Sequence, residues 1–189
     1  MKKRTLLSAL AAICLSCVSL SSQEYANPTL ESIHNRTSVR SYTSKPVSKE
    51  LLIELAKAGM AAPSAMNKQP WEIIIIQDRA ILDKLSTIKP PLGKAPVAIA
   101  VVGDTKVSGS WMLDCSAVTE NILIAATSMG LGTVWTGAYG NEKFEALLKE
   151  TLSLPEGIMP LSVIAVGYAD GVTTPKNKYV ESKVHFDKY

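Results

Sequence analysis

The sequence predicts a layered domain of the α+β or α/β class, in which helices cover a central sheet. Apolar runs of strand type alternate with segments of helical periodicity from Ser48 to Tyr168. The chain has 189 residues, of which 47% are hydrophobic and 20% are charged. This composition suits one domain with an extensive core. It excludes disordered and disulfide-stapled classes, because the apolar content is high and there are only 3 cysteines.

Helices are expected where capping residues precede apolar residues at helical spacing. Ser48 is a candidate N-cap for a helix that ends at Gly59. The longest helix is predicted to end before Gly130, at the position where a left-handed cap is usual. The predicted helices cover residues 48–59, 79–86, 110–129 and 141–148, and a further short helix ends near Asn35.

Three strands are expected from runs that are apolar on both faces, as in strands covered on both sides of a sheet. They cover residues 72–77, 97–103 and 161–168. The glycines of segment 130–137 would let the backbone approach a ligand closely, and the alternative is a tight turn from a helix to a strand. No repeat or linker divides the chain, so a single domain is predicted over residues 23–189.

The longest predicted helix carries a stripe of small side chains. Ala117, Asn121 and Ala125 recur at a spacing of four residues, which places them on one face of the helix. Small side chains let another helix approach closely. The neighbour is either a helix of the same subunit or the same helix of a second copy in a homodimer, and the sequence leaves both open.

Residues 1–22 have the layout of a bacterial secretory signal peptide. Lys2, Lys3 and Arg4 precede an apolar run that is shorter than the ~20 residues of a membrane-spanning helix, which makes a permanent anchor the weaker alternative. These three residues account for the whole formal charge of +3. The remaining domain is neutral, and its charge gives no reason to expect a nucleic acid partner.

The leader predicts export to the periplasm or the cell envelope. Cys17 is a candidate lipid acceptor, but Cys14 and Ser16 depart from the lipoprotein pattern, so plain cleavage at the end of the leader is favoured. Attachment to a membrane is expected only if Cys17 is lipidated. Cys115 has no His or basic neighbour close in sequence to activate it, and we expect it to be a packing residue.

Two basic clusters stand out in this apolar chain. The first combines guanidinium and hydroxyl groups at Arg36, Thr37, Ser38 and Arg40, and the second places Lys176 and Lys178 in a loop after the last strand. Such donors suit a phosphate monoester, which carries about −1.5 to −2 charges and three acceptor oxygens. For each cluster taken alone, a solvated surface is the alternative.

The segment before the first strand, residues 62–71, is rich in amide and hydroxyl groups. Ser64, Asn67 and Gln69 supply side chains that can bond the edge of a heteroaromatic ring. Two prolines fix the backbone of this segment, so a rigid connector between helix and strand is the alternative.

These segments together resemble the FMN-dependent nitroreductase family. The resemblance rests on Arg-x-Ser-x-Arg at 36–40, Pro-Ser-x-x-Asn-x-Gln-Pro-Trp at 63–71, the Gly-Leu-Gly turn at 130–132 and the basic tail. It covers residue 30 to the C-terminus and implies an α+β sandwich with a central mixed, mostly antiparallel sheet flanked by helices. It further implies an intertwined homodimer with two FMN sites at the subunit interface.

The resemblance also assigns residues to the flavin. The implied ligands of the phosphate and the pyrimidine edge are Arg36, Thr37, Ser38, Arg40, Lys176 and Lys178. The implied residues of the other subunit along the isoalloxazine are Pro63, Ser64, Ala65 and Asn67. The residues implied to lie along the flavin face and edge, with backbone N–H groups toward N5, are Trp135, Thr136 and Gly137.

The implied activity is a ping-pong reaction. NAD(P)H, a diffusible reductant, donates hydride to N5 of non-covalently bound FMN, and a nitroaromatic, quinone or similar electron-poor small aromatic molecule then takes the electrons. No catalytic acid, base or nucleophile and no metal site are expected, because the flavin carries the redox chemistry. Many nitroreductases have an acidic residue where this chain has Thr136, which leaves the choice of substrate open. The alternative is an exported flavin-binding protein without nicotinamide-driven turnover, because NAD(P)H is scarce outside the cytoplasm.

Overall fold

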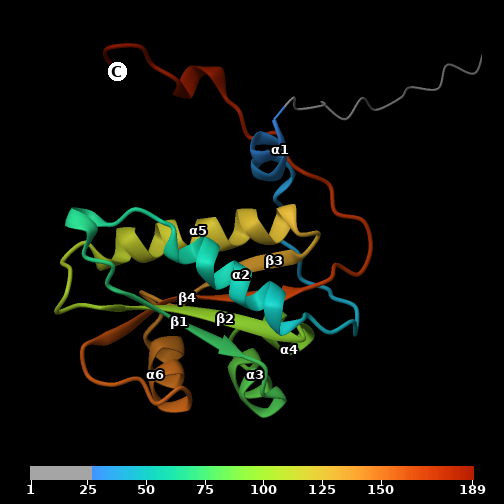
Figure 1. Ribbon diagram of the computed structural model, residues 1–189, viewed down its shortest axis with the longest axis vertical. Coiled ribbons are helices and arrows are strands. Elements are labelled where there is room, and N and C mark those ends of the chain that lie inside the picture. Colours follow the sequence, from blue (N-terminus) through green and yellow to red (C-terminus); the bar gives the residue numbers. More distant parts are fainter. Residues whose placement is uncertain (1–26) are drawn as a thin grey trace, which may run out of the picture.

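The computed structural model describes residues 27–189 and contains one sheet between two layers of helices (Figure 1). Neighbouring strands pair antiparallel in the order β1-β2-β4-β3, and one isolated parallel bridge joins Ser38 to Thr133. The strands are β1 (Trp71–Ile76), β2 (Val97–Asp104), β3 (Gly132–Gly137) and β4 (Ile158–Gly167). The predicted α+β class with a mostly antiparallel central sheet is therefore confirmed.

The helices divide between the two faces of the sheet (Figure 1). One face packs on α2 (Lys49–Met60) and α5 (Trp111–Ser128), whereas the opposite face packs on α3 (Arg79–Ser86), α4 (Pro91–Lys94) and α6 (Glu142–Thr151). Each face has its own core of fully buried apolar side chains. The predicted helices match the observed ones closely, since the ends of these helices depend on local capping residues.

Two of the predicted caps show that nearby residues determine where the helices begin and end. The Ser48 hydroxyl accepts a hydrogen bond from the Leu51 backbone N–H at 3.3 Å and so begins α2. After α5, Gly130 has a φ of 71°, and the Leu131 N–H donates to the Ala126 carbonyl at 2.8 Å. This is the geometry of a Schellman cap, which favours glycine at the left-handed position.

The sheet differs from the sequence prediction at both edges. The β1 strand was expected to be covered on both sides, but it is an edge strand whose Ile73, Ile74 and Ile75 are only half-buried. The other edge strand, β3, was read as part of a turn because it contains two glycines. Gly132 is needed there, since a Cβ at this position would lie 2.8 Å from a Cγ of Val39.

The stripe of small side chains on α5 packs against α2 of the same chain. The Asn121 side-chain amide donates to the Ala58 carbonyl of α2 at 3.1 Å. A Cβ on Gly59 of α2 would lie 2.9 Å from Ile122 of α5, so the two helices are in close contact. Of the two alternatives left open by the sequence, the contact within one subunit is the one that the structure contains.

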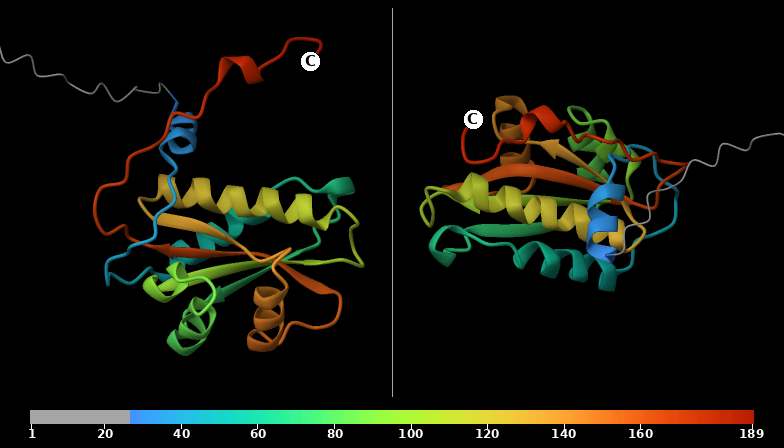
Figure 2. Two further views of the ribbon diagram at one scale, coloured as in Figure 1. Left: turned by 180° about the vertical axis from the view of Figure 1, so that it is seen from behind. Right: turned by 90° about the horizontal axis from the view of Figure 1, so that it is seen from above.

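Both ends of the described chain stand away from the sheet. Figure 2 shows α1 (Pro28–Asn35) and the C-terminal segment beyond residue 170 on the same side of the molecule. Among residues 27–189, no helix is both long and apolar enough to cross a bilayer. The predicted signal peptide at 1–22 lies outside the described residues and stays a prediction.

Large hydrophobic side chains are exposed on the two end segments, at Leu30, Ile33, Val172, Tyr179, Val180, Val184, Phe186 and Tyr189.

The close approach at Gly132 gives a prediction about stability. Gly132→Ala is expected to lower the free energy of unfolding by about 1–3 kcal/mol, because the added methyl group must displace Val39 in a packed region. Gly109→Ala is the control, since its Cβ would meet nothing within 4 Å. Urea denaturation of both variants measures the difference. Equal stability of the two would show that the approach at Gly132 is not tight.

Candidate functional site

The segment that follows α1 is bonded to one end of the sheet. The Val39 N–H donates to the Thr133 carbonyl of β3 at 2.8 Å, and the Thr43 N–H donates to the Tyr168 carbonyl at 2.9 Å. The side chain of Val39 is buried, whereas Ser38 and Arg40 on either side of it are exposed. Since successive side chains of an extended segment point in opposite directions, burial of Val39 directs Ser38 and Arg40 outward.

The buried side chain of Tyr42 also holds the segment that follows α1. Its hydroxyl lies 2.6 Å from the carbonyl oxygen of Val39 and 3.3 Å from that of Ala165 in β4. Burial raises the pKa of the Tyr42 phenol well above its usual range, despite the opposing effect of the Arg40 charge. The hydroxyl therefore stays protonated and remains a donor to these carbonyls at any physiological pH.

The two basic clusters of the sequence meet at this end of the sheet. They line one cleft of about 340 Å³, called the basic cleft below. No acidic side chain is among its lining residues in the described part of the chain. The lining residues are Arg36, Thr37, Ser38, Arg40, Thr173, Thr174, Lys176 and Lys178.

Two contacts restrict the guanidinium groups of the basic cleft. Arg36 Nε lies 3.6 Å from Glu120 Oε1 of α5, and only 17% of the Arg36 side chain is exposed. Arg40 Nη1 donates to the Ser38 carbonyl at 3.4 Å. Arg36 is thus held in a half-buried position, which lowers the entropy that it loses on binding an anion, whereas Arg40 stays exposed.

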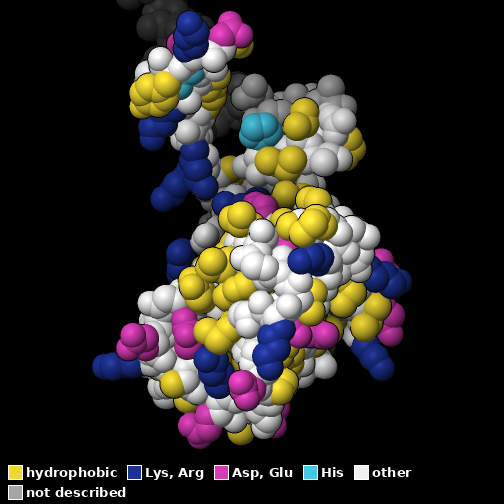
Figure 3. Space-filling model, turned by 90° about the vertical axis from the view of Figure 1, so that its left-hand side faces the viewer, with side chains coloured by type: hydrophobic (Ala, Val, Ile, Leu, Met, Phe, Trp, Pro, Cys, Tyr) yellow, Lys and Arg dark blue, Asp and Glu magenta, His cyan; other side chains and the backbone are white. Residues whose placement is uncertain are grey.

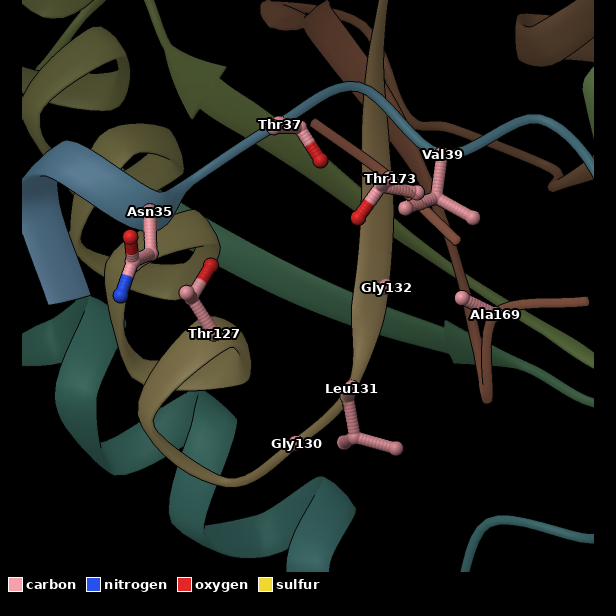
Figure 4. A pocket seen from close by; sticks show the side chains of 9 residues that line it. All are labelled: Asn35, Thr37, Val39, Thr127, Gly130, Leu131, Gly132, Ala169 and Thr173. Atoms are coloured by element: carbon pink, nitrogen blue, oxygen red, sulfur yellow. The ribbon is translucent and has the colours of Figure 1, made fainter. Parts of the chain in front are cut away.

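A second pocket of about 190 Å³ adjoins the basic cleft and shares Thr37 and Thr173 with it. Figure 4 shows Asn35, Thr37, Thr127 and Thr173 around one space, between the segment after α1, the end of α5 and the start of β3. The second pocket lies at the C-terminal end of α5, where Thr127 and Gly130 line it, and it has apolar lining residues as well as polar ones.

The 62–70 loop has a shape fixed by its own polar side chains. The Ser64 hydroxyl accepts from the Gln69 N–H at 3.0 Å, and the Gln69 side-chain amide donates to Asn67 Oδ1 at 2.8 Å. Met66, Asn67 and Gln69 all have φ near +50°. Such left-handed conformations are strained for residues other than glycine, so the loop is held in a specific shape.

The predicted site residues fall into three sets. One set comes together in the basic cleft, namely Arg36, Thr37, Ser38, Arg40, Lys176 and Lys178. A second set does not line this cleft, namely Pro63, Ser64, Ala65 and Asn67. Their loop is bonded to Asp114 in the first turn of α5, whereas Arg36 of the cleft pairs with Glu120 in the middle of that helix.

The third predicted set lies on β3, whose first residue, Gly132, lines the second pocket. Trp135 and Gly137 are exposed on this edge strand. Thr136 is buried, and its hydroxyl donates to the Val163 carbonyl at 2.6 Å. The Thr136 hydroxyl is therefore bonded to β4, and only the backbone of this residue is available to bind a ligand.

Sequence reasoning missed four residues of this region. Thr173 and Thr174 line the basic cleft, and their position just before the predicted basic loop was a usable signal. Glu120 and Asp114 lie within the predicted helix over residues 110–129, to which the sequence analysis assigns no acidic site residue. An acidic residue in the first turn of an otherwise apolar helix was the available signal for Asp114.

The donors of the basic cleft fit a phosphate group. Two guanidinium groups, two ammonium groups and several hydroxyls surround a space with no acidic lining. A phosphate monoester needs several charge-assisted hydrogen bonds to replace the water it loses. The chemistry of the lining thus agrees with the predicted phosphate end of FMN.

Hydrophobic side chains are exposed at the opposite end of the molecule. Figure 3 shows them on the end that carries the 62–70 loop and the start of α5. The exposed large hydrophobic residues of these elements and their neighbours are Met66, Val107, Leu113 and Tyr139. An apolar patch of this kind marks a surface for an apolar ligand or partner.

Comparisons with known proteins agree on one family. Residues 33–90 and 87–168 match the profile of the Nitroreductase family. A solved structure from Parabacteroides distasonis, provisionally named NADH dehydrogenase/NAD(P)H nitroreductase, is 47% identical, with a TM-score of 0.84, over 86% of this chain and 99% of that one. A protein of Methanothermobacter thermautotrophicus with the same provisional name is 37% identical over 85% of this chain and 87% of its own length. An FMN reductase [NAD(P)H] of Bacillus subtilis is 28% identical over 84% and 73%.

The expected location in the periplasm or cell envelope is wrong. The relatives are named for NADH and NAD(P)H, reductants that are scarce in those compartments. The match to the Parabacteroides distasonis structure takes in 99% of that chain but only 86% of this one. The export prediction depended on residues 1–22 alone, which lie outside the described residues, and lipid attachment at Cys17 depended on it in turn.

Cys115 gives a prediction about reactivity. Burial, with a smaller contribution from the charge of Asp114, raises the pKa of its thiol to about 12, so the thiolate is absent from the folded protein at pH 8. We expect iodoacetamide to leave Cys115 unmodified in the native protein and to alkylate it in urea. Peptide mass spectrometry measures both. Native alkylation as fast as in urea would contradict this burial.

Proposed function

The chain belongs to the Nitroreductase family, and from that premise we propose that the basic cleft holds the phosphate of FMN. The chain is an FMN-dependent NAD(P)H oxidoreductase. When bound, FMN supplies the redox chemistry by taking hydride from the nicotinamide and passing electrons to an acceptor. The chain's own residues bind the flavin, orient it and exclude water.

The observation that carries the proposal is the convergence of Arg36, Arg40, Lys176 and Lys178 on one cleft. Among the described residues, Arg36 is paired with Glu120, whereas no ion pair is seen for Arg40, Lys176 or Lys178, so an anion bound in the cleft would lower the repulsion between these cations. A phosphate dianion neutralises part of this charge, and the hydroxyls of Thr37 and Ser38 supply further donors. The cleft therefore fixes the position of one end of the flavin.

We further propose that the site is completed by a second copy of the chain. The 62–70 loop does not line the basic cleft of its own subunit, so we place it against the flavin of the partner subunit. The end segments with their exposed hydrophobic side chains provide a surface that a homodimer would cover. In such a dimer, Pro63, Ser64, Ala65 and Asn67 line the isoalloxazine ring.

The proposed substrates are electron-poor aromatic molecules such as nitroaromatics and quinones. The exposed Trp135 beside the flavin and the apolar surface around the 62–70 loop favour flat, apolar molecules over charged ones. The nicotinamide and the acceptor then occupy the same face in turn, which gives a ping-pong order. The protein accelerates the reaction by holding each partner stacked against the ring.

The absorbance spectrum tests this function. Purified protein is expected to contain or bind FMN, to lose its oxidised flavin band on anaerobic addition of NADH or NADPH, and to regain it with a quinone. The expectation follows from the cofactor and reductant class of the family. Bound FMN that neither nicotinamide reduces would indicate a flavin-binding protein without turnover. A protein with no affinity for FMN would contradict the proposal.

Arg40 gives a prediction about affinity. Arg40→Ala is expected to weaken FMN binding by about ten- to a hundredfold, because it removes a charge-assisted contact to the phosphate. Lys143→Ala is the matched control, since Lys143 is an exposed cation of α6 that does not line the basic cleft. Fluorescence titration of FMN measures both. An unchanged affinity in Arg40→Ala would remove Arg40 from the phosphate site.

A further inference from the structure

We infer that Asp114 is a positioning residue, which holds the 62–70 loop in the shape that contacts the flavin of the partner subunit. This inference rests on the proposed function of the loop. Asp114 itself touches neither the basic cleft nor the exposed surface of the loop. Its effect on the flavin is transmitted through the loop backbone.

The Asp114 carboxylate is almost fully buried, with 5% of the residue exposed, and each oxygen has one partner. Oδ1 accepts a hydrogen bond from the Ala65 backbone N–H at 2.9 Å, and Oδ2 accepts from the Ser108 hydroxyl at 3.1 Å. Ser108 is itself buried. Burying a carboxylate is costly unless donors compensate for the lost water, so this arrangement requires both partners.

The position of Asp114 in the helix provides further stabilisation. It lies in the first turn of α5, where the N-terminal end of the helix favours negative charge. Just before α5, the Ser110 N–H donates to the Ser108 hydroxyl at 3.1 Å, which fixes the position of Ser108 relative to the start of the helix. Asp114 is thus held by a rigid helix, and the 62–70 loop is held by Asp114.

The loop needs this support because its conformation is strained. Met66, Asn67 and Gln69 each adopt a left-handed φ, which costs of order 1 kcal/mol or more per residue other than glycine. The ends of the loop are tied by backbone bonds, from Ala62 N–H to Gly59 and from Asp104 N–H to Pro70. The bond from Ala65 to Asp114 is the one that joins the middle of the loop to α5.

The Ala65 N–H lies between Ser64 and Asn67, two of the residues proposed to line the flavin. Losing its acceptor would leave a partly buried N–H without a partner and free the middle of the loop to relax toward less strained conformations. The flavin would then meet a mobile surface instead of a fixed one. Asparagine retains an oxygen that can accept this bond, whereas alanine does not.

Three variants test the inference. Asp114→Ala removes both acceptors, and Asp114→Asn keeps an acceptor for Ala65. Thr119→Val is the control, because Thr119 is a fully buried residue of the same helix whose hydroxyl bonds Cys115 and Ser162 and does not contact the loop. The readouts are the FMN dissociation constant, the visible circular dichroism of bound FMN, and hydrogen exchange at Ala65 in the protein without flavin.

Asp114→Ala is expected to weaken FMN binding about tenfold, to alter the visible circular dichroism and to accelerate exchange at Ala65. Asp114→Asn is expected to stay within about twofold of the wild type, because the bond to Ala65 survives. Thr119→Val is expected to lose stability while keeping the affinity and the spectrum. A merely structural role would make Asp114→Ala and Thr119→Val alike in all three readouts, and that result would overturn the inference.

A further variant tests the inference if Asp114→Ala does not fold. Ser108→Ala removes the partner of Oδ2 together with the acceptor of the Ser110 N–H, and it is expected to produce the same changes at about two- to threefold in affinity. Wild-type behaviour of Ser108→Ala in that case would overturn the inference. If the wild-type protein itself binds no FMN, the proposed function fails. If it binds FMN and only the variants behave unexpectedly, the role of Asp114 alone fails.

Discussion

The site depends on the backbone hydrogen bonds that hold residues 39–43 against the end of the sheet. The Val39 and Thr43 N–H groups bond β3 and the end of β4, and the Asp170 N–H returns a bond to the Ser41 carbonyl. These bonds bring the start and the end of the domain to the same place. The cations of the first segment therefore meet the basic tail and line one cleft with it. Gly132 permits this contact because it leaves room for the buried Val39 side chain.

The position of the 62–70 loop is the second constraint. The loop is bonded to the first turn of α5 and does not line the basic cleft of its own chain. In the proposed symmetric pair, each copy would supply a phosphate site to one flavin and a loop to the other. The inferred role of Asp114 is to hold the loop in the shape that such a site needs.

Features that depend on neighbouring residues could be predicted from the sequence. The α3 helix runs over the predicted residues, since its cap and apolar spacing are local. The edge position of β1 and the identity of β3 as a strand depend on distant pairings, and both were missed. The chemistry of the clustered cations indicated phosphate binding, and the family resemblance predicted that the two clusters form one site. Thr173 and Asp114 each carried a weak local signal, but the contacts that they make join distant parts of the chain. The exported location was wrong because it was inferred from the leader alone.

The central claim is that the basic cleft binds a phosphate attached to a flavin. Comparing the affinities of the wild-type protein for FMN and for riboflavin tests it most directly, because the two ligands differ only by that phosphate. The account predicts that FMN binds about a hundredfold more tightly or better, as expected for several charge-assisted hydrogen bonds. It also predicts that the difference shrinks as salt is added. Equal affinity for the two flavins would contradict it.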